Sequence, residues 1–400
     1  MRRTVLLAFG TFALGMDGFI MTGLLSDISG DFDVSLSLAG QLVTAFTLCY
    51  ALAAPVCTAV LSSKPAKLVL LGALLVFTLG NGLSALSSSY PLLLVARAIA
   101  GIGAGIYMPM AATTAAALVE PEQRGRALGL VLGGLSIGTV LGMPAGLALA
   151  HLFGWRLTLW AVTGLGLLAL IGIGILLPEL PGSPPMRLRR RMAVLGDPKV
   201  ASIVVVSFVA NIASLGLYTY LAPVLKSVGH IGNPIPYLAT WGIGGILGSL
   251  LIGVVIDRTR RSFSLFTVVM LAFAAAMVVV PLAGGVHALL FLPLLVWGAA
   301  GFASPAPQQE QLLAARPDNS NVVVALNDSA IYLGSAVGSA LFGAVLAAGL
   351  PMSALPYVAA GFAVLGLLVH LLVVPNVSAR TSGASGTGSP VPAEATAVTE

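Results

Sequence analysis

Three charged side chains lie within long apolar stretches of the sequence, where charge is costly. Asp17 is the only ionisable group in LLAFGTFALGMDGFIMTGLL, residues 6–25, and Arg97 and Asp328 interrupt two later apolar runs. A low-dielectric surrounding pushes a carboxyl group toward its neutral form, whereas a nearby guanidinium favours the anion. A carboxyl group balanced between these effects can take up and release a proton as its access to solvent changes. The residue types therefore predict a proton-exchange site at Asp17, with Arg97 as its partner and Asp328 as a second candidate.

The composition places these charges in a membrane protein. Of the 400 residues, 58% are hydrophobic and only 8% are charged, compared with about 25% charged residues in soluble domains. The two cysteines have neither the spacing of a disulfide framework nor that of metal ligands. The sequence contains no phosphate-binding loop, no HExxH motif and no nucleophile elbow. We therefore expect a polytopic membrane protein that is not an enzyme and that holds no metal and no cofactor.

Twelve apolar segments, separated by charged residues and by residues typical of turns, are long enough to cross a bilayer. Because lipid offers the backbone no hydrogen-bond partners, each segment is expected to be a helix. The predicted spans are 5–25, 37–61, 67–86, 90–118, 126–150, 157–178, 200–227, 235–256, 263–282, 286–312, 320–348 and 354–375. The predicted fold is therefore all-α, with twelve transmembrane helices.

The basic residues indicate the orientation of these spans, since Lys and Arg stay on the cytoplasmic side of a membrane. With a cytoplasmic N-terminus, all but three of the 19 Lys and Arg residues fall in cytoplasmic segments, the exceptions being Arg97, Arg156 and Lys226. The protein is therefore predicted to lie in the plasma (inner) membrane, with both termini in the cytoplasm. Topology also accounts for the net charge of +5, so no nucleic-acid partner is expected.

The spans fall into two sets of six. Residues 1–178 are predicted to form an N-terminal bundle and residues 199–375 a C-terminal bundle, joined by a cytoplasmic linker over 179–198. Residues 376–400 consist largely of Ser, Gly, Thr, Ala and Pro and have little to bury, so they are predicted to be a disordered cytoplasmic tail.

A row of glycines in the fifth span has a physical interpretation of its own. Gly138, Gly142 and Gly146 recur every fourth residue, so this glycine stripe lets another helix approach closely, and Pro144 is expected to bend the helix. The eleventh span repeats the spacing from Gly334, at an offset of 196 residues. The offset indicates a parallel repeat of the two bundles, as in transporters that rock two bundles about a central site.

Four motifs together resemble those of the major facilitator superfamily, in particular its twelve-helix drug:proton antiporters. The loop GVVIDRTRR, with Asp257, Arg258 and Arg261, resembles the superfamily's loop signature, and GTVLGMPAG resembles the fifth-helix antiporter signature. RAIAGIGAG, from Arg97, and YTYLAPVL, from Tyr218, are similar to stretches of the exporter branch that holds chloramphenicol-resistance exporters and arabinose-efflux permeases. The first-half copy of the loop departs from the signature, with two serines where Asp-Arg is usual.

The resemblance implies a role for each of these groups. It implies that Asp17 and Arg97 couple transport to protons, that the glycine stripe forms a tight seam between the bundles, and that the second-half loop acts in gating. At a rise of 1.5 Å per residue, Asp17 and Arg97 differ in depth by only about 5 Å, so they can pair. A static ion pair and ordinary helix packing are the structural alternatives.

A substrate cavity between the bundles is expected to be mostly apolar, with a few polar or aromatic anchors. Helical spacing around the charged residues predicts which side chains face it. The predicted substrate contacts are Ile20, Met21, Met108, Asn211, Ser214, Tyr218 and Tyr332.

The expected function is proton-coupled export of a small lipophilic compound, such as an antibiotic, by alternating access. We expect a monomer whose partners are the substrate, protons and the lipid bilayer. Export of a sugar or another polar metabolite is the alternative within transport. A sensor that uses the same fold without transporting is the alternative outside it.

Overall fold

The computed structural model describes residues 2–61, 63–120, 123–179, 193–259, 261–316 and 320–374, and every regular element within these ranges is a helix. The first set of helices comprises α1 (Arg2–Asp31), α2 (Leu36–Leu61), α3 (Ala66–Leu86), α4 (Tyr90–Ala117), α5 (Arg124–Phe153) and α6 (Trp155–Leu176). The second set comprises α8 (Pro198–Tyr218), α9 (Leu221–Gly229), α10 (Ile235–Thr259), α11 (Ser262–Leu282), α12 (Phe291–Ala303), α13 (Pro305–Ala315), α14 (Ser320–Ala347) and α15 (Leu355–Leu372). Short 3₁₀ turns occupy Ala193–Gly196, Ala283–Gly285, His287–Leu290 and Met352–Ala354. Most of the predicted linker and the predicted tail lie outside the described residues.

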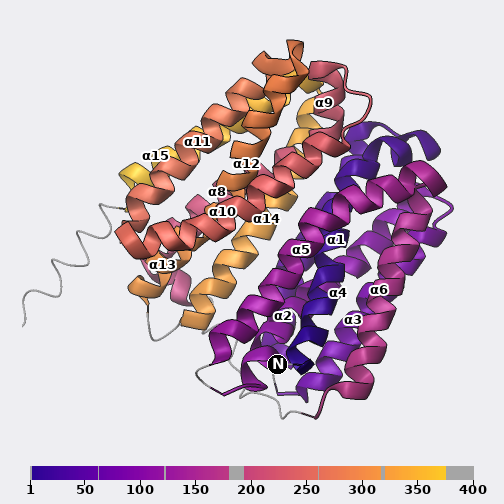
Figure 1. Ribbon diagram of the computed structural model, residues 1–400, viewed down its shortest axis with the longest axis vertical. Helices are drawn as coiled ribbons and strands as arrows, with labels where there is room; N and C mark the ends of the chain where they lie inside the picture. The colour runs from indigo at the N-terminus through magenta and orange to yellow at the C-terminus, as the bar shows by residue number, and fades with distance from the viewer. Residues whose placement is uncertain are drawn as a thin grey trace, which may run out of the picture.

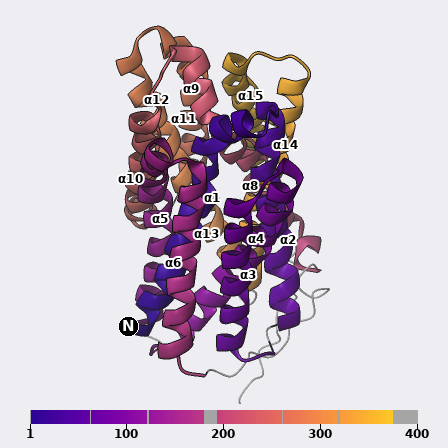
Figure 2. The same ribbon diagram turned by 90° about the vertical axis from the view of Figure 1, so that its right-hand side faces the viewer.

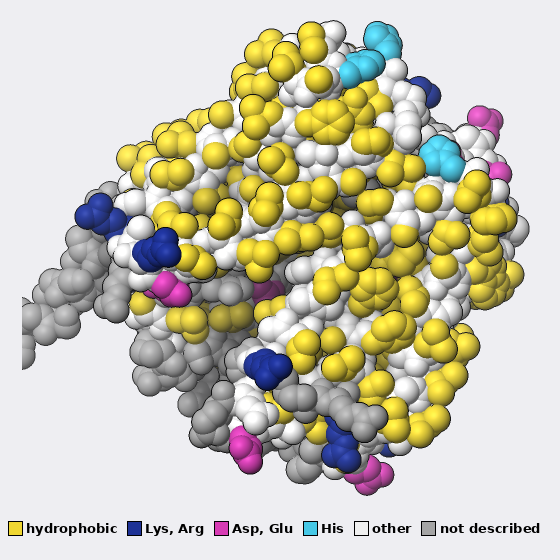
Figure 3. Space-filling view, viewed as in Figure 1, with side chains coloured by type: hydrophobic (Ala, Val, Ile, Leu, Met, Phe, Trp, Pro, Cys, Tyr) yellow, Lys and Arg dark blue, Asp and Glu magenta, His cyan; other side chains and the backbone are white. Residues whose placement is uncertain are grey.

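The helices have the length and surface of membrane spans. Within the described ranges, eleven helical segments are long and apolar enough to cross a membrane, and α5 adds a twelfth if its two arms count as one bent span. The arms of α5 meet at 41° between Gly142 and Pro144, because a proline inside a helix removes a backbone hydrogen bond and clashes with the preceding turn. The predicted bend at Pro144 is confirmed. Figure 3 shows a broad face covered by hydrophobic side chains, with the charged ones mainly toward its edges.

Two predicted spans are interrupted in the structure, although His287–Ala315 as a whole still has the length and hydropathy of one membrane span. The span predicted over 200–227 is divided into α8 and α9, and the span predicted over 286–312 is divided into α12 and α13. Pro223 lies in the first turn of α9, where its ring disfavours a helical bond to the carbonyl of Thr219, four residues earlier. α13 begins at Pro305 for the same reason. Each break therefore follows from a proline, and the hydropathy from which the span was predicted does not reveal the break.

The helices pack as two bundles with the same pattern of neighbours (Figure 1). α1 packs along α5, α2 along α4 and α3 along α6, and the corresponding pairs of the second bundle are α8 with α14, α10 with α12 and α11 with α15. Gly138 of α5 lies against Phe12 of α1, and Gly334 of α14 lies against Phe208 of α8. Both members of this contact are displaced by 196 residues, which is the offset seen in the sequence. The packing is thus that of a parallel repeat.

The bundles are joined to each other through α2 with α14 and α5 with α10. At the end of the molecule away from the N-terminus, Ser37 Oγ donates to the Gly343 carbonyl oxygen at 2.6 Å, and Ser339 Oγ donates to the Gly40 carbonyl oxygen at 3.0 Å. Tyr220 Oη, at the break between α8 and α9, donates to the Ser339 carbonyl oxygen at 3.0 Å. Figure 2 shows α1, α2 and α14 approaching one another toward this end. We call these bonds the end seal.

The glycine stripe of α5 faces α1, inside the N-terminal bundle. A Cβ atom on any of its three glycines would overlap α1 at Phe12, Met16 or Ile20. The expected seam between the bundles is therefore not found at these glycines, because residues four apart share one helix face and α1 occupies that face. The contact of α5 with the other bundle is made by Val140, which lies against Gly242 of α10.

Candidate functional site

A buried ion pair lies inside the N-terminal bundle. Arg97 Nη1 of α4 lies 2.7 Å from Asp17 Oδ1 of α1, and the two side chains are 1% and 0% exposed. The pairing expected from the depths of the two residues is confirmed. Such a pair persists only while both groups keep their hydrogen bonds, because an unpaired buried charge costs several kcal/mol.

Asn81 of α3 completes a buried triad with this ion pair. Its Nδ2 donates to Asp17 Oδ2 at 3.3 Å, and its Oδ1 accepts from Arg97 Nη1 at 3.2 Å. The same Nδ2 also donates to the Phe77 carbonyl oxygen, one turn earlier in α3, at 3.2 Å. Asn81 was missed in the sequence because candidate residues were selected there by charge, and an amide side chain is uncharged. The available signal was an amide between two glycines in a predominantly apolar span.

Phe46 of α2 lies between the buried triad and the space that separates the bundles. Its ring centroid is 4.5 Å from Arg97 Cζ, a cation–π contact. The same side chain lines a pocket between the two bundles, which we call the central pocket. Asp17 does not line this pocket, although Gly18 and Phe19 do. The carboxyl group is therefore next to the pocket wall rather than in it.

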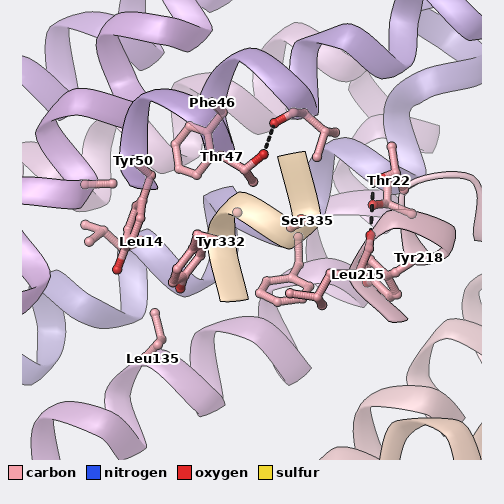
Figure 4. A pocket seen from close by; sticks show the side chains of 15 residues that line it. Leu14, Thr22, Phe46, Thr47, Tyr50, Leu135, Leu215, Tyr218, Tyr332 and Ser335 are labelled. Carbon is pink, nitrogen blue, oxygen red and sulfur yellow. Dashed lines mark hydrogen bonds between the residues drawn. The ribbon is translucent and has the colours of Figure 1, made fainter. Parts of the chain in front are cut away.

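The central pocket is formed by α1, α2, α4, α5, α8 and α14, together with the break that follows α8. Its wall is apolar and aromatic, and none of the side chains that line it is charged. Polar atoms are contributed by tyrosines and by the hydroxyl groups of Thr22, Thr47, Thr219 and Ser335. Figure 4 shows Tyr50 and Tyr332 lying side by side at one edge of the pocket.

Aromatic side chains from the two bundles meet around this pocket. The ring centroids of Tyr50 on α2 and Tyr332 on α14 are 3.8 Å apart. Phe19 of α1 lies 5.3 Å from Tyr218 and 6.0 Å from Trp241, measured between ring centroids. Ring faces of this kind suit an apolar or aromatic ligand.

Two of the seven predicted substrate contacts, Tyr218 and Tyr332, line the central pocket. The other five do not line it: Ile20, Met21, Met108, Asn211 and Ser214. Ile20 packs against the glycine stripe, and Ser214 accepts a hydrogen bond from Trp297 Nε1 at 3.1 Å. On α1 the faces were counted from Asp17, which points into its own bundle, so its neighbours on that face do the same. A role of any of the seven in substrate binding stays a prediction.

Asp328 differs from Asp17 in its access to the surroundings. It is exposed, it lies on α14 one turn before Tyr332, and Gln309 of α13 hydrogen-bonds its carboxylate. Within the described ranges it forms no ion pair. Because α14 begins at the end of the molecule that holds the N-terminus, Asp328 lies between the central pocket and that end.

The C-terminal bundle holds a buried polar cluster without charge, formed by Ser207 of α8, Gln308 of α13 and Asn327 of α14. Ser207 Oγ lies 2.6 Å from Gln308 Oε1 and 2.5 Å from Asn327 Oδ1. All three side chains are at most 2% exposed. The amide nitrogens of Gln308 and Asn327 have no hydrogen-bond partner in the part of the chain that the structure describes. We call these three residues the neutral cluster.

The second-half loop motif lies at the end of α10 and just beyond it. Asp257, Arg258 and Arg261 are exposed and form no ion pair among the described residues. Its gating role stays a prediction. Across the same residues, no group of three or more His, Cys, Asp or Glu side chains is placed to hold a metal ion.

Comparison with known proteins identifies relatives along most of the chain. Residues 7–339 match the family model described as Major Facilitator Superfamily. The inner membrane transport protein YdhP of Escherichia coli strain K12 is 31% identical over 91% of this chain and 93% of its own. A chloramphenicol resistance protein of Streptomyces lividans is 33% identical over 63% of this chain and 66% of its own. A probable sugar efflux transporter of Mannheimia succiniciproducens is 25% identical over 93% of each chain.

Proposed function

The chain belongs to the Major Facilitator Superfamily of membrane transporters, and we propose that it is a proton-coupled exporter of a small lipophilic compound. In this proposal the compound binds in the central pocket, and the two bundles expose the pocket to one side of the membrane at a time. Protons that move inward drive the compound outward. The observation that carries the proposal is the Asp17–Arg97 pair, buried directly behind the wall of the pocket.

Proton exchange follows from the chemistry of this pair. As an anion Asp17 attracts Arg97, and as a neutral acid it loses most of that attraction. Phe46 contacts the guanidinium and also lines the pocket, so a ligand that displaces Phe46 also disturbs the ion pair. A proton delivers about 1.4 kcal/mol per pH unit and, where net charge moves, about 2.3 kcal/mol per 100 mV.

Asp328 has a second part in the proposal. In this conformation Asp17 is sealed inside its bundle, whereas Asp328 is exposed on the side of the pocket that faces the N-terminal end. Asp328 is therefore the group that exchanges protons with that side while the end seal is closed.

The pocket wall supports a lipophilic substrate. Its ring faces and its lack of charged side chains favour a compound without a strong charge of its own, and one relative is named a chloramphenicol resistance protein. We place the chain in the plasma (inner) membrane as a monomer with both termini in the cytoplasm, as the distribution of Lys and Arg favours.

Export of a sugar or another polar metabolite is the second candidate function. The hydroxyl groups of Thr22, Thr47 and Ser335 give the pocket sites that could hydrogen-bond such a compound, and one relative is a probable sugar efflux transporter. Proton-driven transport of radiolabelled chloramphenicol and of radiolabelled arabinose into everted vesicles separates the two candidates.

The central test is a panel of antibiotics applied to a host that lacks its own exporters. We expect the wild-type chain to raise resistance to at least one compound, and Asp17→Asn to abolish that resistance because the proton site is lost. Asp27→Asn is the matched control, since it is the same substitution on the same helix at an exposed position. Resistance that survives Asp17→Asn would remove Asp17 from the mechanism.

A further inference from the structure

We propose that Asn81 is a positioning residue that holds Arg97 while Asp17 takes up a proton. The inference rests on the proposed coupling role of Asp17. It gives the uncharged member of the buried triad a part in the exchange that no charge pattern in the sequence indicates.

The Asn81 amide is bonded at both ends and anchored in its own helix. Nδ2 donates to Asp17 Oδ2 at 3.3 Å and to the Phe77 carbonyl oxygen at 3.2 Å, while Oδ1 accepts from Arg97 Nη1 at 3.2 Å. The side chain is 0% exposed. Because an amide carries a donor and an acceptor but no charge, it can bond both members of the ion pair in either protonation state.

The two acceptors of Arg97 Nη1 are the reason that Asn81 matters to the exchange. The nitrogen donates to Asp17 Oδ1 at 2.7 Å and to Asn81 Oδ1 at 3.2 Å. When Asp17 is protonated, the first of these bonds weakens and Asn81 Oδ1 remains. Arg97 Nε has no hydrogen-bond partner among the described residues, so without Asn81 the Nη1 group would lose its remaining acceptor. Loss of Asn81 therefore penalises the protonated state in particular.

Among the side chains that the structure describes, no other charge faces Asp17 from the helices packed against it. α4 presents Arg97, α2 presents the uncharged ring of Phe46, and α3 presents Asn81. The remaining ionisable side chains that the structure describes on these helices lie toward helix ends, and these are Arg3, Asp27 and Asp31 of α1, Lys67 of α3, Tyr90 of α4, Arg124, Arg126 and His151 of α5, Arg156 of α6 and Lys226 of α9. In the middle of α2 and α4, the Tyr50 ring contacts that of Tyr332, its neighbour Cys49 is partly buried, and Tyr107 donates to the Leu7 carbonyl oxygen.

Substitutions of Asn81 should move the proton affinity of Asp17 in opposite directions. Asn81→Leu removes the second acceptor of Arg97, so the guanidinium turns fully to Asp17 and favours its anion. Loss of the Nδ2 donor works the other way, but that amide nitrogen is shared with the Phe77 carbonyl oxygen, whereas the bond to Arg97 has a charged donor and is the stronger kind. Asn81→Asp keeps an acceptor and adds a like charge beside Asp17, which favours the protonated acid. We expect a decrease of about tenfold for Asn81→Leu and an increase of about tenfold for Asn81→Asp, each equal to one pH unit.

The measurement is an infrared pH titration of the purified full chain in lipid nanodiscs. The carbonyl stretch of protonated Asp17 is assigned by its absence in Asp17→Asn. Ser84→Ala is the matched control, since Ser84 is buried on the same helix and its Oγ donates only within α3, to the Gly80 carbonyl oxygen at 2.8 Å. Asn81→Ala removes the same acceptor without added bulk and replaces Asn81→Leu if that variant does not fold.

The outcomes separate this inference from the function on which it rests. Opposite displacements of the Asp17 titration in the two Asn81 variants, with Ser84→Ala unchanged, support it. If Asp17 titrates but its midpoint is the same in the Asn81 variants as in the wild type, or is displaced in the same direction in both variants, the inference is overturned and the coupling role of Asp17 stays intact. A wild-type chain in which Asp17 never titrates between mildly acid and mildly alkaline pH overturns both.

Discussion

The two bundles repeat the same helix pairings but bury different polar groups. The N-terminal bundle buries an ion pair bridged by an amide, and the C-terminal bundle buries a hydroxyl group with two amides. At the repeat offset of 196 residues, Asp17 corresponds to Ala213, which is 0% exposed and apolar. The repeat therefore preserves the scaffold and not the chemistry. Of these two sets of buried polar groups, only that of the N-terminal bundle contains ionisable side chains.

Among the substitutions that test this difference between the bundles, Arg97→Leu is expected to have the largest effect on stability. This substitution leaves the Asp17 carboxylate buried without its counter-charge, so the free energy of unfolding should fall by about 3–5 kcal/mol. Thermal unfolding in lipid nanodiscs measures the loss. The double substitution Asp17→Leu with Arg97→Leu should recover most of it, because two apolar side chains leave no unpaired charge. A single variant as stable as the wild type would contradict the buried ion pair.

A smaller effect is expected from Ser207→Ala in the neutral cluster. The substitution removes the hydroxyl group that lies within hydrogen-bond distance of both Gln308 and Asn327, and leaving a buried polar group unsatisfied costs about 1–3 kcal/mol. Thermal unfolding should record this loss, while the infrared titration of Asp17 should be unchanged. A titration displaced as far as in the Asn81 variants would show that the two interiors are coupled.

The smallest effect is expected from Asp197→Asn, at the surface of the C-terminal bundle. Asp197 caps α8 by accepting from the Lys199 backbone N–H at 2.9 Å, and it pairs with Arg316 Nε at 2.6 Å. Burial raises the pKa of Asp197, but these two hydrogen bonds outweigh burial and hold the pKa below its usual value of 3.8. Because Arg316 is 49% exposed, we expect a loss of only about 0.5–1 kcal/mol at neutral pH.

The pH dependence of that loss has a definite sign. A carboxyl group whose pKa is lowered by folding stabilises the fold above its unfolded pKa, and this contribution disappears as the pH falls through the folded value. The difference in unfolding free energy between wild type and Asp197→Asn should therefore be constant near neutrality and should decline below about pH 3.8. A difference that grows in acid would contradict the assignment.

Much of the architecture could be predicted from the sequence because hydropathy and depth are properties of single helices. The positions of most spans and the pairing of Asp17 with Arg97 follow from counting residues along one axis, and the bend in α5 follows from the residue type of Pro144. The repeat offset was likewise visible in the spacing of glycines, and the contacts of Gly138 and Gly334 reproduce it.

What could not be predicted depends on how helices turn about their axes. The sequence shows that the glycine stripe occupies one face of α5, but not that α1 rather than the other bundle covers that face. The same rotational freedom explains why Ile20 and Ser214 lie inside their bundles instead of lining the pocket. Asn81 was missed for another reason, since an uncharged side chain barely alters the hydropathy of its span.

The end seal sets an energetic scale for the cycle. Only two of its hydrogen bonds, from Ser37 and from Ser339, cross between the bundles, and a typical protein hydrogen bond contributes about 0.5–1.5 kcal/mol net. Breaking both costs about 1–3 kcal/mol, which is comparable to what one proton yields on crossing an ordinary bacterial membrane potential at about 2.3 kcal/mol per 100 mV. On the proposed mechanism, one proton per turnover therefore supplies about as much free energy as the hydrogen bonds that hold this end of the two bundles together.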